Sequence, residues 1–311
     1  MSSPPQLLKG LAWIGLAILC WGPMFSVAKR TLPIVDAFAL SSIRYVIGGA
    51  LFLVILAMVE GREALRYGPR LAPAIVFGLI GFAGFNSFVW VGLSMTRPEH
   101  ASIIMAIQTP LTALVVWLTR GQRPATFTLG CIAVAIAGVL LVVTRGDPAL
   151  ALAELGAGGE LFGDLLILGG ALCWVAYTFG GPVFAGWSPL RFTALTCLPG
   201  AIGLVIFNVV AVQVGIATVP DAAALSQAAL PIVYFALGTV VLGVLGFNNG
   251  VKHLGPLNTM LMLNIIPVSV FAIEAGLGRS FQAVELAGAA VVIGALVANN
   301  LYLRTRRAPG A

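Results

Sequence analysis

The feature that most constrains this chain is a succession of long apolar stretches, each close to the length that crosses a lipid bilayer. A helix needs about 20 mainly apolar residues to span the hydrocarbon core. Such stretches cover residues 10–28, 36–58, 70–94, 99–119, 125–144, 162–184, 190–213, 228–251, 257–277 and 281–303. They lack the alternation of apolar and polar residues that a membrane β-barrel requires. The sequence therefore predicts an all-α membrane protein with ten transmembrane helices.

Composition leaves almost nothing for a water-facing domain. Hydrophobic residues make up 59% of the chain and charged residues only 9%, whereas soluble domains carry roughly a quarter charged residues. The net charge of +6 does not indicate a nucleic-acid partner, because the distribution of charge among the loops explains it better. The predicted partners are the lipid bilayer and a small-molecule substrate. The sequence leaves the oligomeric state open and is compatible with a monomer.

The basic residues of the loops predict the orientation. With a cytoplasmic N-terminus, the inside carries most of them: Lys9, Arg62, Arg66, Arg70, Arg120, Arg123, Arg191, Lys252, Arg304, Arg306 and Arg307. The outside carries fewer: Lys29, Arg30, Arg97, Arg145 and Arg279. Cytoplasmic loops of membrane proteins are enriched in Lys and Arg. We therefore expect an integral protein of the bacterial inner membrane with both termini in the cytoplasm.

The two halves of the chain repeat a pattern of residues. Pro110 and Gly121 reappear as Pro267 and Gly278 at one offset, since 267 − 110 and 278 − 121 both equal 157. Each half holds five predicted helices, an odd number, so the second half must insert upside down relative to the first. Inverted repeats of this kind place a transport site near the midplane. We expect a first five-helix repeat over residues 1–147, a joint over 148–161, a second, inverted repeat over 162–304 and a cytoplasmic tail over 305–311.

Three quoted runs resemble a known family. They are WGPMFSVAK…P…ALSSIRYVIGGALF, then HASIIMAIQTPLTALVVWLTRG, and its echo NTMLMLNIIPVSVFAIEAGLG. Together they resemble the ten-helix EamA-type branch of the drug/metabolite transporter superfamily, over about Leu11 to Leu303. The resemblance implies a carrier of two inverted five-helix repeats, with members that export amino acids and other small metabolites. Family members often carry a glutamate after the glycine that ends helices four and nine, whereas this chain has Gln122 and Arg279 there.

Arg44 is the candidate residue with the strongest charge argument. It follows Asp36 by eight residues, which places it about 12 Å along a helix that enters the bilayer. A charge at that depth is costly unless it is paired or hydrated, so it marks a functional site by default. Two roles stay open: binding a substrate carboxylate, or bonding carbonyls freed near Pro23 or Pro33.

Other candidate binding residues are aromatic rings and amides predicted near mid-depth. Gln108 and Asn264 lie close to Pro110 and Pro267, and each proline removes a helical hydrogen bond. Pro23 follows Gly22 and predicts a further helix break. Polar side chains beside a broken helix suit a transport cavity, although core packing would also account for the aromatic rings. The predicted cavity is lined by Trp21, Asn86, Gln108, Trp174, Tyr177, Asn248 and Asn264, with Arg44 as a further substrate ligand.

These patterns favour a transporter over an enzyme. The predicted topology separates His100 and His253, so they cannot share a metal or catalytic site, and we expect no metal, no cofactor and no enzymatic activity. His100 is interpreted as an interfacial residue. Glu274 is the only acid placed clearly within a span, next to a surface partner in Arg279, which favours facilitated diffusion or exchange over proton coupling. The predicted function is export of small metabolites, chiefly aromatic or apolar amino acids, by alternating access. The alternatives are a proton-coupled multidrug or other metabolite efflux carrier and a membrane receptor or scaffold.

Overall fold

The computed structural model describes residues 4–147, 149, 159–254 and 256–307. Every regular element in these ranges is a helix, which confirms the predicted all-α class. Most of the expected joint over 148–161, and residues 308–311 of the expected tail, lie outside the described residues. The described chain forms two compact units, and each is described here by itself.

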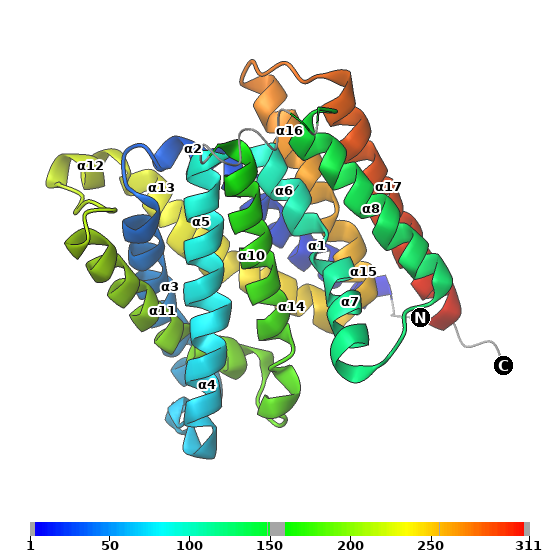
Figure 1. Ribbon diagram of the computed structural model, residues 1–311. Coiled ribbons are helices and arrows are strands. Elements are labelled where there is room, and N and C mark those ends of the chain that lie inside the picture. Colours follow the sequence, from blue (N-terminus) through cyan, green and yellow to red (C-terminus); the bar gives the residue numbers. More distant parts are fainter. Residues whose placement is uncertain (1–3, 148, 150–158, 255, 308–311) are drawn as a thin grey trace. The chain divides into compact units, whose positions relative to one another are not determined.

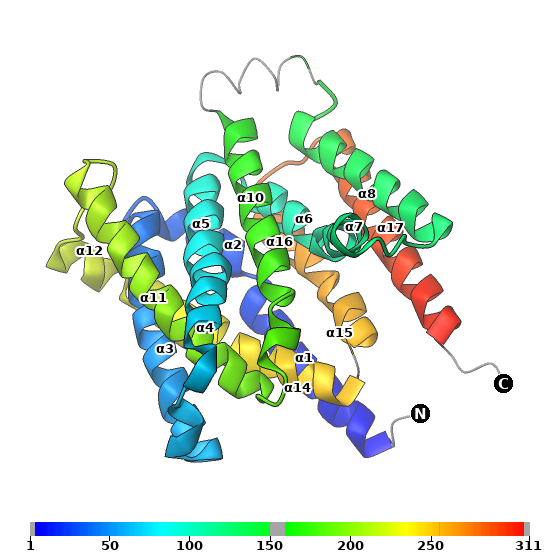
Figure 2. The same cartoon turned by 60° about the horizontal axis from the view of Figure 1, so that its bottom comes forward.

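The first unit combines residues 1–26, 95–165 and 246–311. Its helices are α1 (Pro4–Trp21), α6 (Pro98–Ala106), α7 (Gln108–Arg120), α8 (Thr126–Thr144), α15 (Pro256–Leu263), α16 (Ile265–Gly276) and α17 (Ala283–Arg307). Helices α8 and α17 lie side by side along most of their length (Figures 1 and 2), and α6 packs on α16. Gly138 of α8 faces Val292 of α17 so closely that a Cβ at Gly138 would collide with it.

The second unit combines residues 27–94 and 166–245. Its elements are α3 (Ala37–Glu60), η1 (Arg62–Leu65), η2 (Gly68–Arg70), α4 (Leu71–Gly78), η3 (Leu79–Gly84), α5 (Phe85–Met95), η4 (Gly181–Phe184), α11 (Pro189–Gln213), α12 (Ala222–Gln227), α13 (Ala229–Val233) and η5 (Tyr234–Leu242). Helix α11 packs on α3 and α4. Four helices have residues in both units: α5, of which only Met95 belongs to the first unit, α2 (Met24–Thr31), α10 (Glu160–Thr178) and α14 (Gly243–Leu254).

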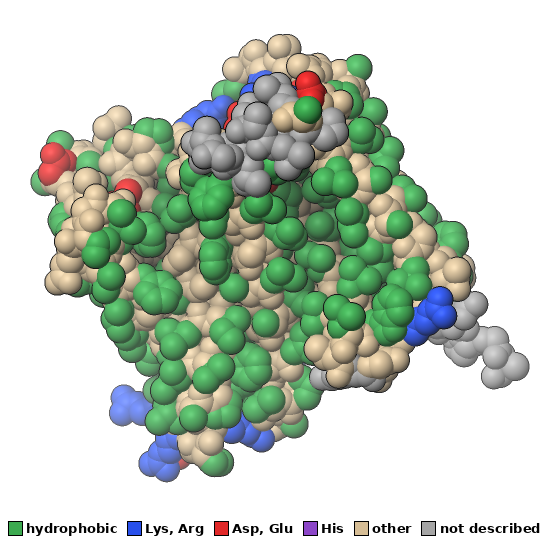
Figure 3. Space-filling view, viewed as in Figure 1, with side chains coloured by type: hydrophobic (Ala, Val, Ile, Leu, Met, Phe, Trp, Pro, Cys, Tyr) green, Lys and Arg blue, Asp and Glu red, His purple; other side chains and the backbone are tan. Residues whose placement is uncertain are grey.

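The membrane spans follow the apolar stretches of the sequence. Eight described helical stretches are long and apolar enough to cross a bilayer, and a bent pair, α6 with α7, makes a ninth. The remaining expected segment, residues 257–277, is divided between α15 and the shorter apolar helix α16. The membrane fold is therefore confirmed, and the count of ten spans is approximate. Hydrophobic side chains are spread over the face shown in Figure 3. Exposed apolar residues include Leu118, 83% exposed, and Met58, 80% exposed, as expected for surfaces that face lipid.

Helix breaks occur at equivalent points of the fourth and ninth expected segments. The breaks fall at Ile107 and Asn264, which are 264 − 107 = 157 residues apart. The two halves of the fourth segment meet at 42°. In both segments a proline, Pro110 or Pro267, follows the break by three residues, and its missing N–H leaves a carbonyl of the preceding turn without a helical donor. A turn at Gly22 and Pro23 likewise separates α1 from α2.

A proline inside α11 shows how the fold satisfies a carbonyl that a proline frees. Pro199 lies within the helix and cannot donate to the carbonyl of Leu195. The hydroxyl of Tyr67 donates to that carbonyl at 2.9 Å instead. At the facing position, Gly78 of α4 approaches the backbone of Thr196 so closely that a Cβ would not fit. The third span is thereby held against α11 by close backbone packing and by one hydrogen bond.

Two spans contain π-helical segments. They are η3, in the third expected span, and η5, in the eighth. A π-helix is formed by i→i+5 hydrogen bonds and is frequent at functional sites. Segment η3 directly precedes α5, which carries Asn86. These segments set the direction of the side chains that follow them.

Candidate functional site

A buried arginine and a buried asparagine meet within the second unit. Arg44 of α3 is only 2% exposed, and its guanidinium donates to Oδ1 of Asn86 on α5. Trp90 donates from its indole nitrogen to the same oxygen at 2.9 Å. Asn86 in turn donates from Nδ2 to the carbonyl of Phe82 at 2.7 Å, one turn earlier. The asparagine is therefore held in one orientation, with its oxygen toward the arginine.

Aromatic rings surround the same guanidinium. Its central carbon lies 4.2 Å from the ring centroid of Trp90, 4.9 Å from that of Tyr45 and 5.7 Å from that of Phe235. Cation–π attraction at such distances contributes about 2 kcal/mol for a desolvated cation. The rings and the amide oxygen stabilise the charge without neutralising it.

The positive charge of Arg44 has no acidic partner among the described residues. No carboxylate of the described chain lies within 4.0 Å of its guanidinium, and its Nε has no hydrogen-bond acceptor there. The hydrogen bond that the guanidinium makes in the described chain goes to Asn86, so both roles that the sequence left open stay predictions. A buried cation without an acidic partner is costly in a membrane protein, so Arg44 is a candidate functional residue.

Trp174 and Tyr177 join this cluster through two intervening rings. Tyr45 contacts Phe82 with ring centroids 5.5 Å apart, and Phe82 contacts Tyr177 at 5.2 Å and Trp174 at 6.5 Å. The Tyr177 hydroxyl lies 3.0 Å from that of Thr196, and its side chain is almost fully buried, as in a packing residue. Trp174 is half-buried. The structure thus places four of the predicted residues, Arg44, Asn86, Trp174 and Tyr177, in one connected group.

The other four predicted residues belong to the first unit. Trp21 contacts Phe247, with ring centroids 5.8 Å apart, and Asn248 is half-buried on α14. Gln108 directly follows the helix break at Ile107, and its Nε2 lies 3.7 Å from the sulfur of Met105. Asn264 stands at the second break as the N-cap of α16, with no side-chain cap and with its buried Nδ2 lacking an acceptor in the described chain. The two helix breaks therefore each present an amide.

A second polar group in the first unit was not expected. Glu99 and His100 of α6 are fully buried, and Asp164 of α10 and Glu285 of α17 are nearly so. The interpretation of His100 as interfacial stays a prediction, and its side chain is fully buried within the protein. Glu274, which sequence named as the only acid clearly within a span, is one of several buried acids. These residues all lie within about a turn or two of a helix end, where sequence places them at the membrane surface. The adjacent pair Glu99-His100, directly after Pro98, is the one local signal that could have indicated them.

His100 bridges two elements of this group. Its Nδ1 lies 3.0 Å from Oδ2 of Asp164, and Thr96 donates its hydroxyl to Oδ1 of the same carboxylate at 2.6 Å. An ionised carboxylate only accepts hydrogen bonds, so Nδ1 must carry a proton and donate it. The opposite ring nitrogen, Nε2, is buried and has no hydrogen-bond partner in the described chain.

Three arginines join the acids into one network. Arg279 Nη2 lies 2.5 Å from Oε1 of Glu99 and 3.1 Å from Oε1 of Glu285. Arg97 lies 2.8 Å from Glu160 and 3.8 Å from Glu285. Arg145 also pairs with Glu160. Among the described residues Arg279 therefore pairs with Glu99 and Glu285, not with Glu274 as the sequence suggested. We call Arg97, Glu99, His100, Arg145, Glu160, Asp164, Arg279 and Glu285 the acid–base cluster.

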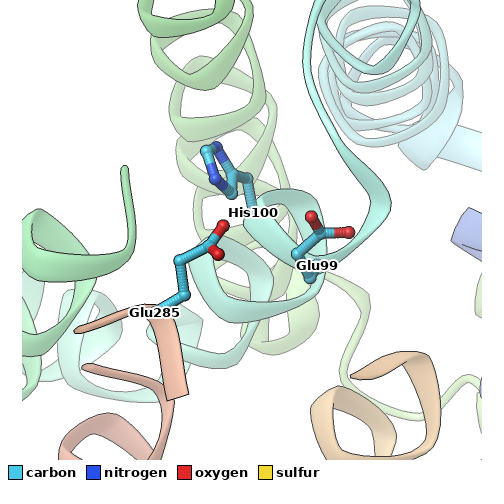
Figure 4. Close-up of side chains that lie close together, drawn as sticks. All are labelled: Glu99, His100 and Glu285. Atoms are coloured by element: carbon cyan, nitrogen blue, oxygen red, sulfur yellow. The ribbon is translucent and has the colours of Figure 1, made fainter. Parts of the chain in front are cut away.

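Three members of the acid–base cluster converge closely enough to raise the question of a metal ion. Glu99 and His100 on α6 and Glu285 on α17 lie close together (Figure 4), with one potential ligand atom from each within 4.8 Å of the others. The guanidinium of Arg279 already bridges the two glutamates. Because a cationic side chain already pairs with both carboxylates, the geometry does not identify these three residues as metal ligands.

A pocket of about 400 Å³ opens at the surface of the second unit. It is lined by Glu63, Arg66, Tyr67, Gly68, Pro69, Arg70, Trp187 and Arg191. None of the predicted binding residues belongs to it, so this pocket is distinct from the group around Arg44.

The comparisons with known proteins decide the family. The model of the EamA-like transporter family matches residues 8–144 and again residues 161–301. The chain belongs to the EamA-like transporter family. Two relatives from Bacillus subtilis (strain 168) are similar over most of their length. "Uncharacterized transporter YrdR" is 29% identical over 302 residues, covering 96% of this chain and 93% of the relative. "Uncharacterized transporter YyaM" is 30% identical over 283 residues, covering 90% of each.

A solved structure supports the fold of this EamA-type chain. A protein described as "Crystal structure of protein" superposes with a TM-score of 0.65 at 20% identity, covering 95% of this chain and 98% of the other. At that identity the likeness shows the fold alone. The family match, the relatives and the apolar helices together establish an integral membrane protein of the EamA transporter type.

Proposed function

We propose that this EamA-type transporter exports amino acids, and that Arg44 binds the substrate carboxylate. The observation that carries the proposal is the buried guanidinium of Arg44, which donates from Nη2 to Asn86 and lies against three rings but has no carboxylate partner among the described residues. Arginine matches the two oxygens of a carboxylate with a planar, forked set of donors. A carboxylate placed there supplies the missing negative charge.

The surrounding rings suit an apolar or aromatic side chain. Tyr45, Phe82 and Trp174 extend from the guanidinium as a connected series of aromatic contacts. Such rings offer a large apolar area and, for Trp and Tyr, one hydrogen-bond donor each. An amino acid with an aromatic or aliphatic side chain carries both a carboxylate for Arg44 and an apolar group for these rings.

We further propose transport by alternating access of two inverted repeats in the bacterial inner membrane, with both termini in the cytoplasm. Two observations support the repeat: the family model matches the chain twice, and the helix breaks at Ile107 and Asn264 recur at the spacing of the repeated prolines. In such carriers, one set of helices rocks against the other around a central site.

Counterflow in proteoliposomes tests the substrate class. Vesicles loaded with unlabelled substrate take up the labelled compound only if the protein carries it. We compare phenylalanine with phenethylamine, which lacks the carboxylate, and with phenylpropionate, which lacks the amine. The proposal expects phenylalanine to be exchanged far faster than phenethylamine. Equal rates for phenylalanine and phenethylamine would contradict a carboxylate site.

Variants of Arg44 test whether the preference for substrates with a carboxylate depends on this residue. Loss of a hydrogen bond to a charged group costs about 1.5–3 kcal/mol, so Arg44→Gln should weaken phenylalanine binding about tenfold to a hundredfold. Arg44→Lys keeps the charge and should retain part of the affinity. Arg62→Gln, at an exposed arginine of η1, is the matched control and should leave affinity unchanged. Exchange of a cationic dye without any amino acid would instead indicate a multidrug carrier, and binding without transport a receptor or scaffold.

A further inference from the structure

We propose that the acid–base cluster of the first unit is a proton-binding site, with Nε2 of His100 as the acceptor. We propose further that the bound proton is exchanged for substrate during transport. The second statement rests on the proposed transport function, whereas the first does not. Sequence placed only Glu274 clearly within a span, and the expectation of uncoupled transport depended on that placement.

The geometry of His100 supplies the acceptor. The hydrogen bonds of Asp164 and Thr96 fix the proton of the neutral ring on Nδ1, which leaves the lone pair of Nε2 available. That lone pair is buried and meets no donor in the described chain. A histidine oriented by a carboxylate in this way is well suited to take a proton on its second nitrogen.

The charges of the cluster leave room for one more positive charge. Its guanidiniums are those of Arg97, Arg145 and Arg279, and its carboxylates are those of Glu99, Glu160, Asp164 and Glu285. With neutral His100 and all four carboxylates ionised, the sum is 3 − 4 = −1. Three of those carboxylates, Glu99, Asp164 and Glu285, are buried, and uncompensated charge on buried groups of a membrane protein is costly. One proton on His100 brings this sum to zero. A divalent cation would raise it to +1 and would compete with the guanidinium of Arg279 for the same carboxylates.

Protonation of His100 would affect the packing of several helices at once. His100 and Glu99 lie on α6, Asp164 on α10 and Glu285 on α17, while Arg145 and Arg279 directly follow α8 and α16. Helix α6 packs on α8 and α16, and α16 carries the further buried acid Glu274. When His100 gains its proton, the imidazolium attracts the carboxylates of Glu99 and Glu285 near it. Loss of the proton removes that attraction, so protonation favours one arrangement of these helices over another.

The first experiment measures proton binding without any substrate. The chain has two histidines, so a His253→Gln variant labelled with nitrogen-15 histidine reports on His100 alone. In lipid nanodiscs, nitrogen-15 spectra from about pH 8 to about pH 5 distinguish a ring with one proton from a ring with two. We expect conversion to the doubly protonated ring while the protein stays folded. A ring that keeps a single proton throughout this range would overturn the proposal.

The second experiment measures coupling. A pH gradient of one unit across proteoliposomes should drive up to about tenfold accumulation of substrate for one-to-one exchange. His100→Asn keeps a donor for Asp164 but cannot bind the proton, so it should retain counterflow and lose the driven accumulation. Glu63→Gln, at an exposed acid of the second unit, is the matched control and should behave as the unmodified chain. Accumulation that survives in His100→Asn would contradict coupling through this residue.

The outcomes separate this inference from the proposed substrate. If no amino acid is carried but His100 gains its second proton, the proton site stands and the substrate proposal fails. If amino acids are exchanged but His100 never gains the proton, the proton site fails alone. Titration with Zn²⁺ or Mn²⁺ tests whether the acid–base cluster binds a metal ion in place of a proton. Binding of one ion per chain that Glu99→Gln abolishes would replace the proton site with a metal site.

Discussion

Arg279 lies 2.5 Å from a carboxylate oxygen of Glu99, although 279 − 99 = 180 residues separate them in the chain. Glu99 is fully buried, while Arg279 stays partly open to its surroundings. The ion pair therefore connects the first turn of α6 with the segment between α16 and α17. It also gives a buried carboxylate a compensating charge.

Removal of Arg279 should destabilise the protein. Arg279→Gln leaves the carboxylate of Glu99 buried without its nearest cation, and breaking a buried pair in this way costs about 3 kcal/mol or more. We expect a clearly lower melting temperature in detergent. The double variant Arg279→Gln with Glu99→Gln should recover much of the loss, because no unpaired charge then remains. A double variant that is no more stable than Arg279→Gln would show that Glu99 is not the group that depends on this arginine.

Asn86→Asp should reduce the affinity for substrates that carry a carboxylate. The new carboxylate would stand beside Arg44 and neutralise it, so a substrate would lose its attraction to the guanidinium. We expect at least a tenfold weaker apparent affinity for phenylalanine in counterflow, with little change for a substrate that lacks the carboxylate. Asn86→Gln serves as the uncharged control. An equal effect of Asn86→Asp on both substrates would show that the substrate carboxylate does not bind at Arg44.

The amides at the two helix breaks should contribute to substrate binding. Gln108→Ala or Asn264→Leu removes a hydrogen-bonding group, which for a charged substrate group costs about 1.5–3 kcal/mol. The apparent affinity should fall about tenfold to a hundredfold. Trp21→Ala should weaken the binding of large apolar substrates more than the binding of small ones. Unchanged affinities across every transported amino acid would remove these residues from the site.

Glu274→Gln should leave substrate exchange in pH-clamped vesicles largely intact. The residue lies in α16 and is buried, but the proposed proton acceptor is His100. Counterflow and driven accumulation should both persist in this variant. Abolished exchange in a folded, inserted protein would bring Glu274 into the mechanism.

Reporter fusions test the proposed orientation. Fusions after Arg123 and Arg307 should report a cytoplasmic position, and fusions after Arg97 and Asp147 an external one, because the basic loops are expected inside. Cysteine labelling from either side of the membrane checks the same four positions. A cytoplasmic signal after Asp147 would reverse the assignment.

Much of the fold could be predicted because the bilayer imposes a length and a composition on each helix. The apolar stretches gave the helices, and the depth of Arg44 within a span indicated a buried charge. Sequence also named Asn86, which the structure places on the guanidinium of Arg44. The prolines marked Ile107 and Asn264 as the neighbourhood of the breaks, since a missing N–H has a local effect.

The acid–base cluster could not be predicted in the same way. Glu99, Asp164 and Glu285 lie near helix ends, and a residue there is exposed or buried according to which other segments cover it. The pairing of Glu99 with Arg279 depends on contacts between segments 180 residues apart. Periodicity and hydropathy describe single helices, so they do not show which ends converge.

The π-helical segment η3 has a consequence for how the site tolerates changes of chain length. Each residue of an α-helix turns the next side chain by about 100°. A π-helical turn takes about one residue more than an α-helical turn, so deletion of one residue between Leu79 and Gly84 can be absorbed by conversion of η3 into a regular helix. Asn86 would then keep its direction toward Arg44. A stretch that is already α-helical has no extra residue to give up, so a deletion within it would rotate all later side chains by that angle.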